Sequence, residues 1–121
     1  MKPESSVVFF PCNDIEETVN YYTNVLGLSV YKRQKDTVWI DCGYGYIAFV
    51  EYADNRPMAQ GQCISFNMAS VDEVKAMYAL LLSRGAMGLK SVPQKHPRFP
   101  VYSFFLTDPN GYTLEFQKVL E

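Results

Sequence analysis

One stretch decides the fold of this chain, residues 107–117, which read Thr107-Asp108-Pro109-Asn110-Gly111-Tyr112-Thr113-Leu114-Glu115-Phe116-Gln117. Its first half is typical of a hairpin turn, because Pro109 fixes one backbone dihedral and Asn110-Gly111 tolerates positive φ. Its second half alternates polar and apolar residues, as a half-buried strand does. The stretch therefore predicts a tight turn leading into a strand that places the Glu115 carboxylate among apolar residues.

A weaker copy of this stretch occurs at residues 43–51, which read Gly-Tyr-Gly-Tyr-Ile-Ala-Phe-Val-Glu. Aligning Gly45-Tyr46 with Gly111-Tyr112 places Phe49 opposite Glu115. We interpret the chain as two versions of one structural unit, in which the second copy carries a carboxylate and the first an aromatic ring.

The bulk composition excludes several classes of protein. A length of 121 residues predicts one compact domain, and 48% hydrophobic with 20% charged residues is too apolar for a disordered chain. A net charge of −2 lacks the basic surface of a nucleic-acid-binding domain, and no apolar run approaches the roughly 20 residues of a membrane span. The three cysteines lack metal-site spacing and no signal peptide opens the chain, so we expect a cytoplasmic protein with reduced thiols.

The order of the expected elements repeats. Asp14 and Ser70 each precede a helical pattern and have a glutamate three residues later, which is the arrangement of a capping box. Gly27 and Gly85 are placed to end the two helices. Strands are expected near 7–12, 28–34, 37–42, 45–52, 63–68, 87–92, 101–106 and 112–118, whereas three prolines make residues 93–100 irregular.

This pattern predicts an α+β fold of two βαβββ modules related by pseudo-twofold symmetry. A single domain of residues 1–121 would contain a first module at about 5–52, a linker at 53–61 and a second module at about 62–118. Each sheet has a helix against one face. The other faces would curve together into a cupped mixed sheet whose cavity we call the cup.

Three passages resemble the vicinal oxygen chelate superfamily, which includes glyoxalase I, bleomycin resistance proteins and extradiol dioxygenases. They are residues 13–28 with their Leu-Gly ending, residues 64–85, and the closing Asp108-Pro109-Asn110-Gly111 followed by Glu115. The resemblance covers nearly the whole chain and implies the glyoxalase/bleomycin resistance fold. It also implies a homodimer, since half-barrels of this superfamily commonly complete their cups by pairing.

The resemblance implies metal ligands at four equivalent strand positions, which by spacing are Val7, Phe49, Cys63 and Glu115. Val7 and Phe49 have no donor atoms, and one thiolate with one carboxylate is a poor site for zinc or for a hard divalent ion. We therefore expect no metal or other cofactor. A divalent metal at Glu115, completed by water, stays the alternative.

Period-2 alternation assigns side chains to the two faces of each strand. It directs Glu51 into the cup together with nine candidate ligand-binding residues: Phe9, Ile47, Phe49, Cys63, Ser65, Asn67, Thr113, Glu115 and Gln117. Among these, Glu115 is also the candidate catalytic base. His96, the only histidine, lies in the proline-rich loop and is a second acid/base candidate.

Three functions stay open on these residues. The first is a glyoxalase-like, bleomycin-resistance-like protein that binds a small organic molecule in the cup without a tightly held metal. The second is a metal-dependent or metal-free lyase, isomerase or dioxygenase that uses Glu115. The third is a structural dimer with a vestigial cavity. Expected partners are a small ligand and a second copy, with neither nucleic acid nor membrane.

Overall fold

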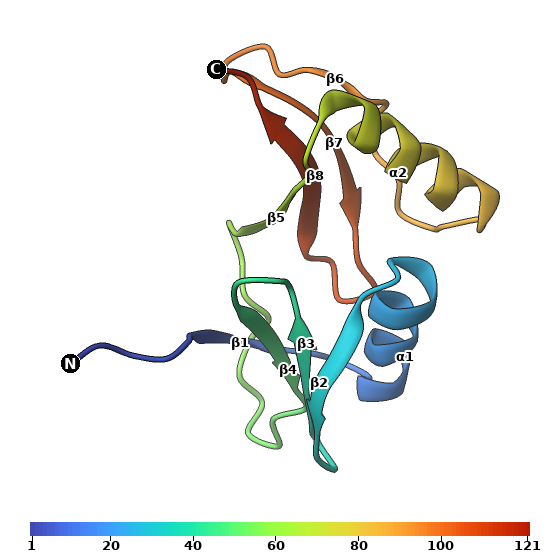
Figure 1. The fold of residues 1–121 in the computed structure, drawn as a ribbon. Coiled ribbons are helices and arrows are strands. Elements are labelled where there is room, and N and C mark those ends of the chain that lie inside the picture. Colours follow the sequence, from blue (N-terminus) through green and yellow to red (C-terminus); the bar gives the residue numbers. More distant parts are fainter. The chain divides into compact units, whose positions relative to one another are not determined.

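The computed structural model describes residues 1–121 and divides into two compact units. We call Met1–Gln60 the first module and Gly61–Glu121 the second module. Each contains one sheet of four strands (Figure 1). No helix is both long and apolar enough to cross a membrane.

The first module repeats the expected order of elements. They are β1 (Val7–Pro11), α1 (Ile15–Asn20), the π-helical turn η1 (Tyr21–Val25), β2 (Ser29–Arg33), β3 (Thr37–Asp41) and β4 (Tyr46–Val50). The sheet order is β1-β4-β3-β2, with β1 parallel to β4 and the other neighbours antiparallel. Such a mixed sheet was predicted.

The second module has the same topology. Its elements are β5 (Cys63–Asn67), α2 (Val71–Ser83), β6 (Gln94–Lys95), β7 (Val101–Thr107) and β8 (Thr113–Val119). The sheet order is β5-β8-β7-β6, with β5 parallel to β8 and the other neighbours antiparallel. The βαβββ order therefore occurs twice, as the sequence predicted.

Both helices begin where the capping residues predicted. The Glu17 amide donates to Asp14 Oδ1 at 3.0 Å, and the Glu73 amide donates to Ser70 Oγ at 3.1 Å. These contacts satisfy backbone donors that the first helical turn leaves unpaired. The helical segments end at the predicted glycines, since Gly27 and Gly85 have φ values of 81° and 65°.

The turn before β8 is held by the carboxylate of Asp108. Its Oδ1 accepts hydrogen bonds from the Asn110 amide at 2.8 Å and from the Tyr112 amide at 2.9 Å. Gly111 adopts a φ of 88°, which a residue with a side chain rarely adopts. The Asp-Pro-Asn-Gly motif thus fixes the point at which β8 begins and, with it, the face on which Glu115 lies.

The predicted strand near 87–92 was wrong. Gly88 has a φ of 88°, and a Cβ atom there would lie 2.2 Å from the Thr107 carbonyl oxygen. Positive φ at this close approach interrupts an extended backbone, so only an isolated bridge pairs Leu89 with Leu106. The fourth strand of the sheet is instead the short edge strand β6, which lies within the segment expected to be irregular.

Each module has its own aromatic core between helix and sheet. In the first, the Tyr22 and Phe49 rings lie 4.7 Å apart between centroids. In the second, Phe104 lies 5.2 Å from Tyr78 of α2 and 5.4 Å from Phe116. Because α2 covers this side of the second sheet, the residues that alternate with Phe104 and Phe116 lie on its other side.

Candidate functional site

The open face of the second sheet is the side opposite α2, and it carries the polar residues that the sequence directed to one face. Parallel pairing of β5 with β8 aligns them in three pairs. Paired residues of neighbouring strands share a face. The pairs are Cys63 with Thr113, Ser65 with Glu115, and Asn67 with Gln117. The face expected for these six residues is confirmed.

Glu115 is a buried carboxylate at the centre of this face. It is 7% exposed, and Ser65 donates a hydrogen bond from its hydroxyl to Glu115 Oε1. A buried charge is costly unless it is hydrogen-bonded, and Ser65 supplies that bond from the neighbouring strand. Since Ser65 uses one oxygen, Oε2 is available to a hydrogen-bond donor or to a cation.

Cys63 lies two residues before Ser65 on β5 and faces the same way. Its Sγ is 3.8 Å from Ser65 Oγ. Partial burial of the thiol raises the pKa of Cys63, the hydrogen bond with Ser65 lowers it, and the Glu115 carboxylate raises it. Burial is the largest of these effects, so the raised pKa leaves Cys63 a neutral thiol at pH 7. A neutral thiol is a poor nucleophile and a poor metal ligand.

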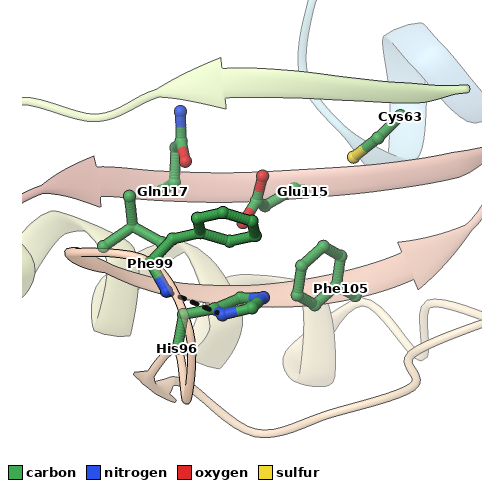
Figure 2. A pocket seen from close by; sticks show the side chains of 7 residues that line it. Cys63, His96, Phe99, Phe105, Glu115 and Gln117 are labelled. Carbon is green, nitrogen blue, oxygen red and sulfur yellow. Dashed lines mark hydrogen bonds between the residues drawn. The ribbon is translucent and has the colours of Figure 1, made fainter.

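A pocket of about 420 Å³ opens over Glu115 (Figure 2). Its walls combine aromatic and aliphatic side chains with three polar groups and the Cys63 thiol. The lining residues are Cys63, His96, Phe99, Val101, Phe105, Glu115 and Gln117. All seven belong to the second module, so this one unit builds the pocket. A mostly apolar cavity with a few convergent polar groups is the usual form of a small-molecule site.

His96 stands at the pocket with one ring nitrogen already used. Its Nδ1 accepts hydrogen bonds from the Arg98 amide at 3.0 Å and from the Phe99 amide at 3.3 Å. An acceptor nitrogen carries no proton, so the neutral ring has its proton on Nε2 and presents a donor there. The imidazole also packs against Phe99, with 4.9 Å between ring centroids. His96 therefore shapes the loop that brings Phe99 over the pocket (Figure 2).

Gln117 supplies a second acceptor beside Glu115. Its Nε2 donates to Asn67 Oδ1 at 3.0 Å. This bond assigns the amide orientation and leaves the carbonyl oxygen of Gln117 for the pocket. The ionisable side chains of the lining are the Glu115 carboxyl, the His96 imidazole and the Cys63 thiol, and no Lys or Arg is among the lining residues. Asn67 and Thr113 share the open face but do not line the pocket.

The expected orientation of Phe49 and Ile47 was wrong. Phe49 is fully buried against Tyr22 of η1, and Ile47 shares its face by alternation along β4. Glu51 also lies toward the helix, where its carboxylate accepts a hydrogen bond from the Ile15 amide. These three residues belong to the helix side of the first sheet and not to its open face.

The cause is a one-residue error in the alignment of the two copies. Val7 of β1 pairs with Tyr46 of β4, and the equivalent residue of β5, Cys63, pairs with Thr113 of β8. Phe9 and Ser65 each lie two residues further along their strands, so their partners on β4 and β8 are equivalent as well. The partner of Phe9 is Ala48, which is therefore the residue of β4 equivalent to Glu115. The turn before β4 is one residue different from the turn before β8. The sequence did not reveal this difference in turn length, because Gly45-Tyr46 matches Gly111-Tyr112 in residue type.

Phe9 does lie on the open face of the first sheet, as expected. It is 47% exposed and meets Trp39 edge to face at 5.9 Å. Tyr31 and Tyr46 continue the cluster, with 4.4 Å between their ring centroids. Lys32 Nζ lies 4.8 Å above the Trp39 ring and adds a cation–π contact.

Metal ligation fits the residues poorly. The corrected alignment gives Val7, Ala48, Cys63 and Glu115 as the four positions that the resemblance implied. Val7 and Ala48 have no donor atoms, and Cys63 holds its proton at neutral pH. No group of three or more His, Cys, Asp or Glu side chains is placed to hold an ion. Zinc takes about four donors, and harder divalent ions take six or more oxygens.

Three pocket residues were missed from the sequence: Phe99, Val101 and Phe105. A signal existed for two of them. Phe105 pairs with Glu115 across β7 and β8, and Val101 shares its face by period-2 alternation. Counting back from the turn would have placed Phe105 beside Glu115 and Val101 further along the same face, opposite Val119. Phe99 gave no such signal, because it lies in a loop whose path depends on the His96 hydrogen bonds.

Comparison with known proteins identifies the fold. Residues 6–116 match the family model described as the Glyoxalase/Bleomycin resistance protein/Dioxygenase superfamily. No curated protein sequence matches the chain.

Solved structures of this fold cover nearly the whole chain. A glyoxalase/bleomycin resistance protein/dioxygenase from Nocardioides has a TM-score of 0.78 at 19% identity, covering 100% of this chain and 86% of that one. One from Alicyclobacillus acidocaldarius has a TM-score of 0.79 at 18% identity, covering 98% and 92%. Lactoylglutathione lyase from Agrobacterium tumefaciens has a TM-score of 0.75 at 19% identity, covering 97% and 96%. These likenesses confirm the predicted fold class.

Proposed function

The chain belongs to the Glyoxalase/Bleomycin resistance protein/Dioxygenase superfamily, and we propose that it binds a small organic molecule in the pocket of its second module. One observation carries this proposal. A buried carboxylate, Glu115, opens into a cavity of about 420 Å³ whose other walls include Phe99, Val101 and Phe105. A cavity of this size suits a molecule of drug-like dimensions.

The lining indicates the chemistry of the ligand. Phe99 and Phe105 offer ring faces and edges to a flat apolar body. Glu115 and the carbonyl of Gln117 offer acceptors, and no positive side chain in the lining competes for the carboxylate. An aromatic or other flat molecule that carries an ammonium group satisfies both features. An anion would meet the Glu115 charge without a compensating partner.

We propose that this binding needs no tightly held metal. The support is chemical, since two of the four positions implied by the superfamily lack donor atoms and Cys63 is a neutral thiol. The alternative is a metal-dependent lyase, isomerase or dioxygenase using Glu115. This alternative requires about one bound metal ion per chain, and the substitution Glu115→Ala should remove that ion. Metal analysis of protein purified without chelator distinguishes metal-free binding from the metal-dependent enzyme. A stoichiometric metal ion in the wild type that is absent from Glu115→Ala would favour the enzyme.

The test is calorimetric titration with three probes of similar shape and different charge. They are tryptamine, 3-methylindole and indole-3-acetate, which are cationic, neutral and anionic at pH 7. We expect tryptamine to bind most tightly and indole-3-acetate least. Glu115→Gln should weaken tryptamine by about ten- to a hundredfold, because a charged hydrogen bond is worth about 1.5–3 kcal/mol. It should leave 3-methylindole nearly unchanged.

A matched control is Glu121→Gln, which removes the same charge at an exposed position of the same module. It is expected to bind all three probes as the wild type does. Equal tryptamine affinity in wild type and Glu115→Gln would contradict the proposal. So would a preference for the anionic probe.

A further inference from the structure

We propose that a second, smaller pocket beside the first is a subsite for a neutral, hydrogen-bonding group of the same ligand, such as a carboxamide. This inference rests on the proposed function. The pocket has a volume of about 240 Å³. It is lined by Ser91, Gln94, His96, Pro97, Ser103 and Phe105.

The two pockets are neighbours over β7. They share His96 and Phe105 as lining residues. Ser103 and Phe105 lie on the open face of β7, since they pair with Gln117 and Glu115 of β8. Gln94 of β6 pairs with Ser103 from the other side. The first pocket therefore lies over β8 and β7, and the second extends toward β6 and the sheet edge.

The shared wall consists of two rings. The His96 and Phe105 centroids are 6.2 Å apart, with 69° between the ring planes (Figure 2). A flat ligand body that packs against Phe105 therefore reaches both pockets. Its ammonium end would meet Glu115 in the first, and a substituent at its opposite end would enter the second.

The second pocket contains polar groups with unused hydrogen-bonding capacity. Ser103 is 3% exposed and lines this pocket. Ser91 Oγ accepts from the Phe105 amide at 2.9 Å, so its own hydrogen can be donated. Gln94 Nε2 donates to the Val92 carbonyl at 3.3 Å, which leaves the Gln94 side-chain oxygen as an acceptor. A ligand group that enters this pocket can accept from the serine hydroxyls and donate to the Gln94 oxygen.

The absence of charge in this lining selects a neutral group. No Asp, Glu, Lys or Arg lines the pocket, so an ionised group there would be desolvated without a counter-ion. A carboxamide matches the available set, because its oxygen accepts from the two serine hydroxyls and its N–H groups donate to Gln94. The two pockets together thus specify a flat molecule with an ammonium group at one end and an amide at the other.

The test compares tryptamine with 5-carboxamidotryptamine and with the corresponding 5-carboxylate by calorimetry. In wild type, the carboxamide is expected to increase affinity about tenfold over tryptamine, as one or two added hydrogen bonds would. Ser103→Ala should abolish that gain and leave tryptamine itself unchanged. Ser83→Ala, an exposed serine on α2, is the control and should retain the gain.

A second measurement keeps the subsite separate from the proposed function. Benzamide alone is titrated into the protein while backbone amide chemical shifts are followed by NMR. The amide signals of Ser91, Gln94 and Ser103 should shift. If tryptamine binds but the carboxamide adds nothing and benzamide moves none of these amides, the subsite is overturned and the proposed function stands. If tryptamine fails to bind while benzamide moves them, the proposed function fails and the neutral subsite stands alone. Tighter binding of the 5-carboxylate than of the carboxamide would overturn the neutral class.

Discussion

Ser65 and Glu115 occupy paired positions on the parallel strands β5 and β8, and the Ser65 hydroxyl donates a hydrogen bond to Glu115 Oε1. The pair is 50 residues apart in the chain and is brought together by the sheet register. Its geometry gives the Glu115 carboxyl, which is only 7% exposed, a hydrogen-bond donor on the neighbouring strand. The same bond fixes which Glu115 oxygen is available to a ligand.

Ser65→Ala should therefore destabilise the protein. The substitution leaves the buried Glu115 oxygen without its donor, which costs about 1–3 kcal/mol. Urea unfolding measures the loss. Asn67→Ala, two residues further along the same face but outside the pocket lining, should cost less than half as much. In a double-mutant cycle with Glu115→Gln, a coupling energy below about 0.5 kcal/mol would contradict the assigned bond.

Phe49→Ala should unfold the first module more easily and should not act as a ligand-site variant. Phe49 is fully buried against Tyr22, and removing such a side chain costs about 3–5 kcal/mol through lost burial and a cavity. Phe9→Ala is the control, because Phe9 is 47% exposed on the other face and should cost about 1 kcal/mol. Urea unfolding of both variants checks the difference. Similar losses of unfolding free energy in the two variants would contradict the buried position of Phe49 and support the orientation that alternation predicted from the sequence.

Much of the fold was predictable because its signals are local. Asp14, Ser70, Gly27 and Gly85 define both helices through caps and positive φ, and these positions hold in the structure. The Asp108 turn likewise contains in four residues the chemistry that positions β8. Alternation along β5 and β8 then assigned the open face of the second module correctly, because the turn fixed where β8 begins.

The rest depended on contacts between residues distant in sequence. The face of Phe49 depends on where β4 pairs with β1, and a one-residue slip moves every side chain to the other face. Gly88 interrupts the expected strand because of the Thr107 carbonyl, which lies 19 positions away in the chain (107 − 88). Phe99 reaches the pocket through two hydrogen bonds to a histidine in a loop. No periodicity in the sequence contains any of these three relationships.

A homodimer is the expected assembly in solution. Strand β2 is the outermost strand of the first sheet, and all five of its residues are exposed. A strand edge with unpaired backbone groups favours pairing with a second copy, and twofold dimers are the commonest assemblies. Light scattering should give about twice the 13.8 kDa mass of one chain. Val30→Lys, which adds charge to β2, should shift the mass toward the monomer. A mass near 13.8 kDa at all concentrations in wild type would refute the dimer.

Cys63 should react slowly with iodoacetamide at pH 7 and faster when Glu115 loses its charge. Burial and the Glu115 carboxylate both raise the pKa of Cys63, so the reactive thiolate is scarce at neutral pH. Glu115→Gln removes one of these causes, lowers the pKa and should move the rate profile to lower pH. Cys42 is the internal control, since burial and Asp41 raise its pKa and Glu115 is not among the causes. Mass spectrometry resolves the two sites. An unchanged Cys63 profile in Glu115→Gln would disprove the electrostatic contact.

The loop that carries Phe99 should depend on the His96 ring nitrogen. His96 Nδ1 accepts hydrogen bonds from the Arg98 and Phe99 amides, and a side chain without an acceptor cannot replace it. His96→Ala should therefore speed hydrogen exchange at these two amides by about tenfold, the equivalent of about 1.4 kcal/mol for a lost bond. The Lys90 amide, which donates to the Phe105 carbonyl, should keep its rate. His96→Asn offers a side-chain oxygen at a similar reach and should restore part of the protection.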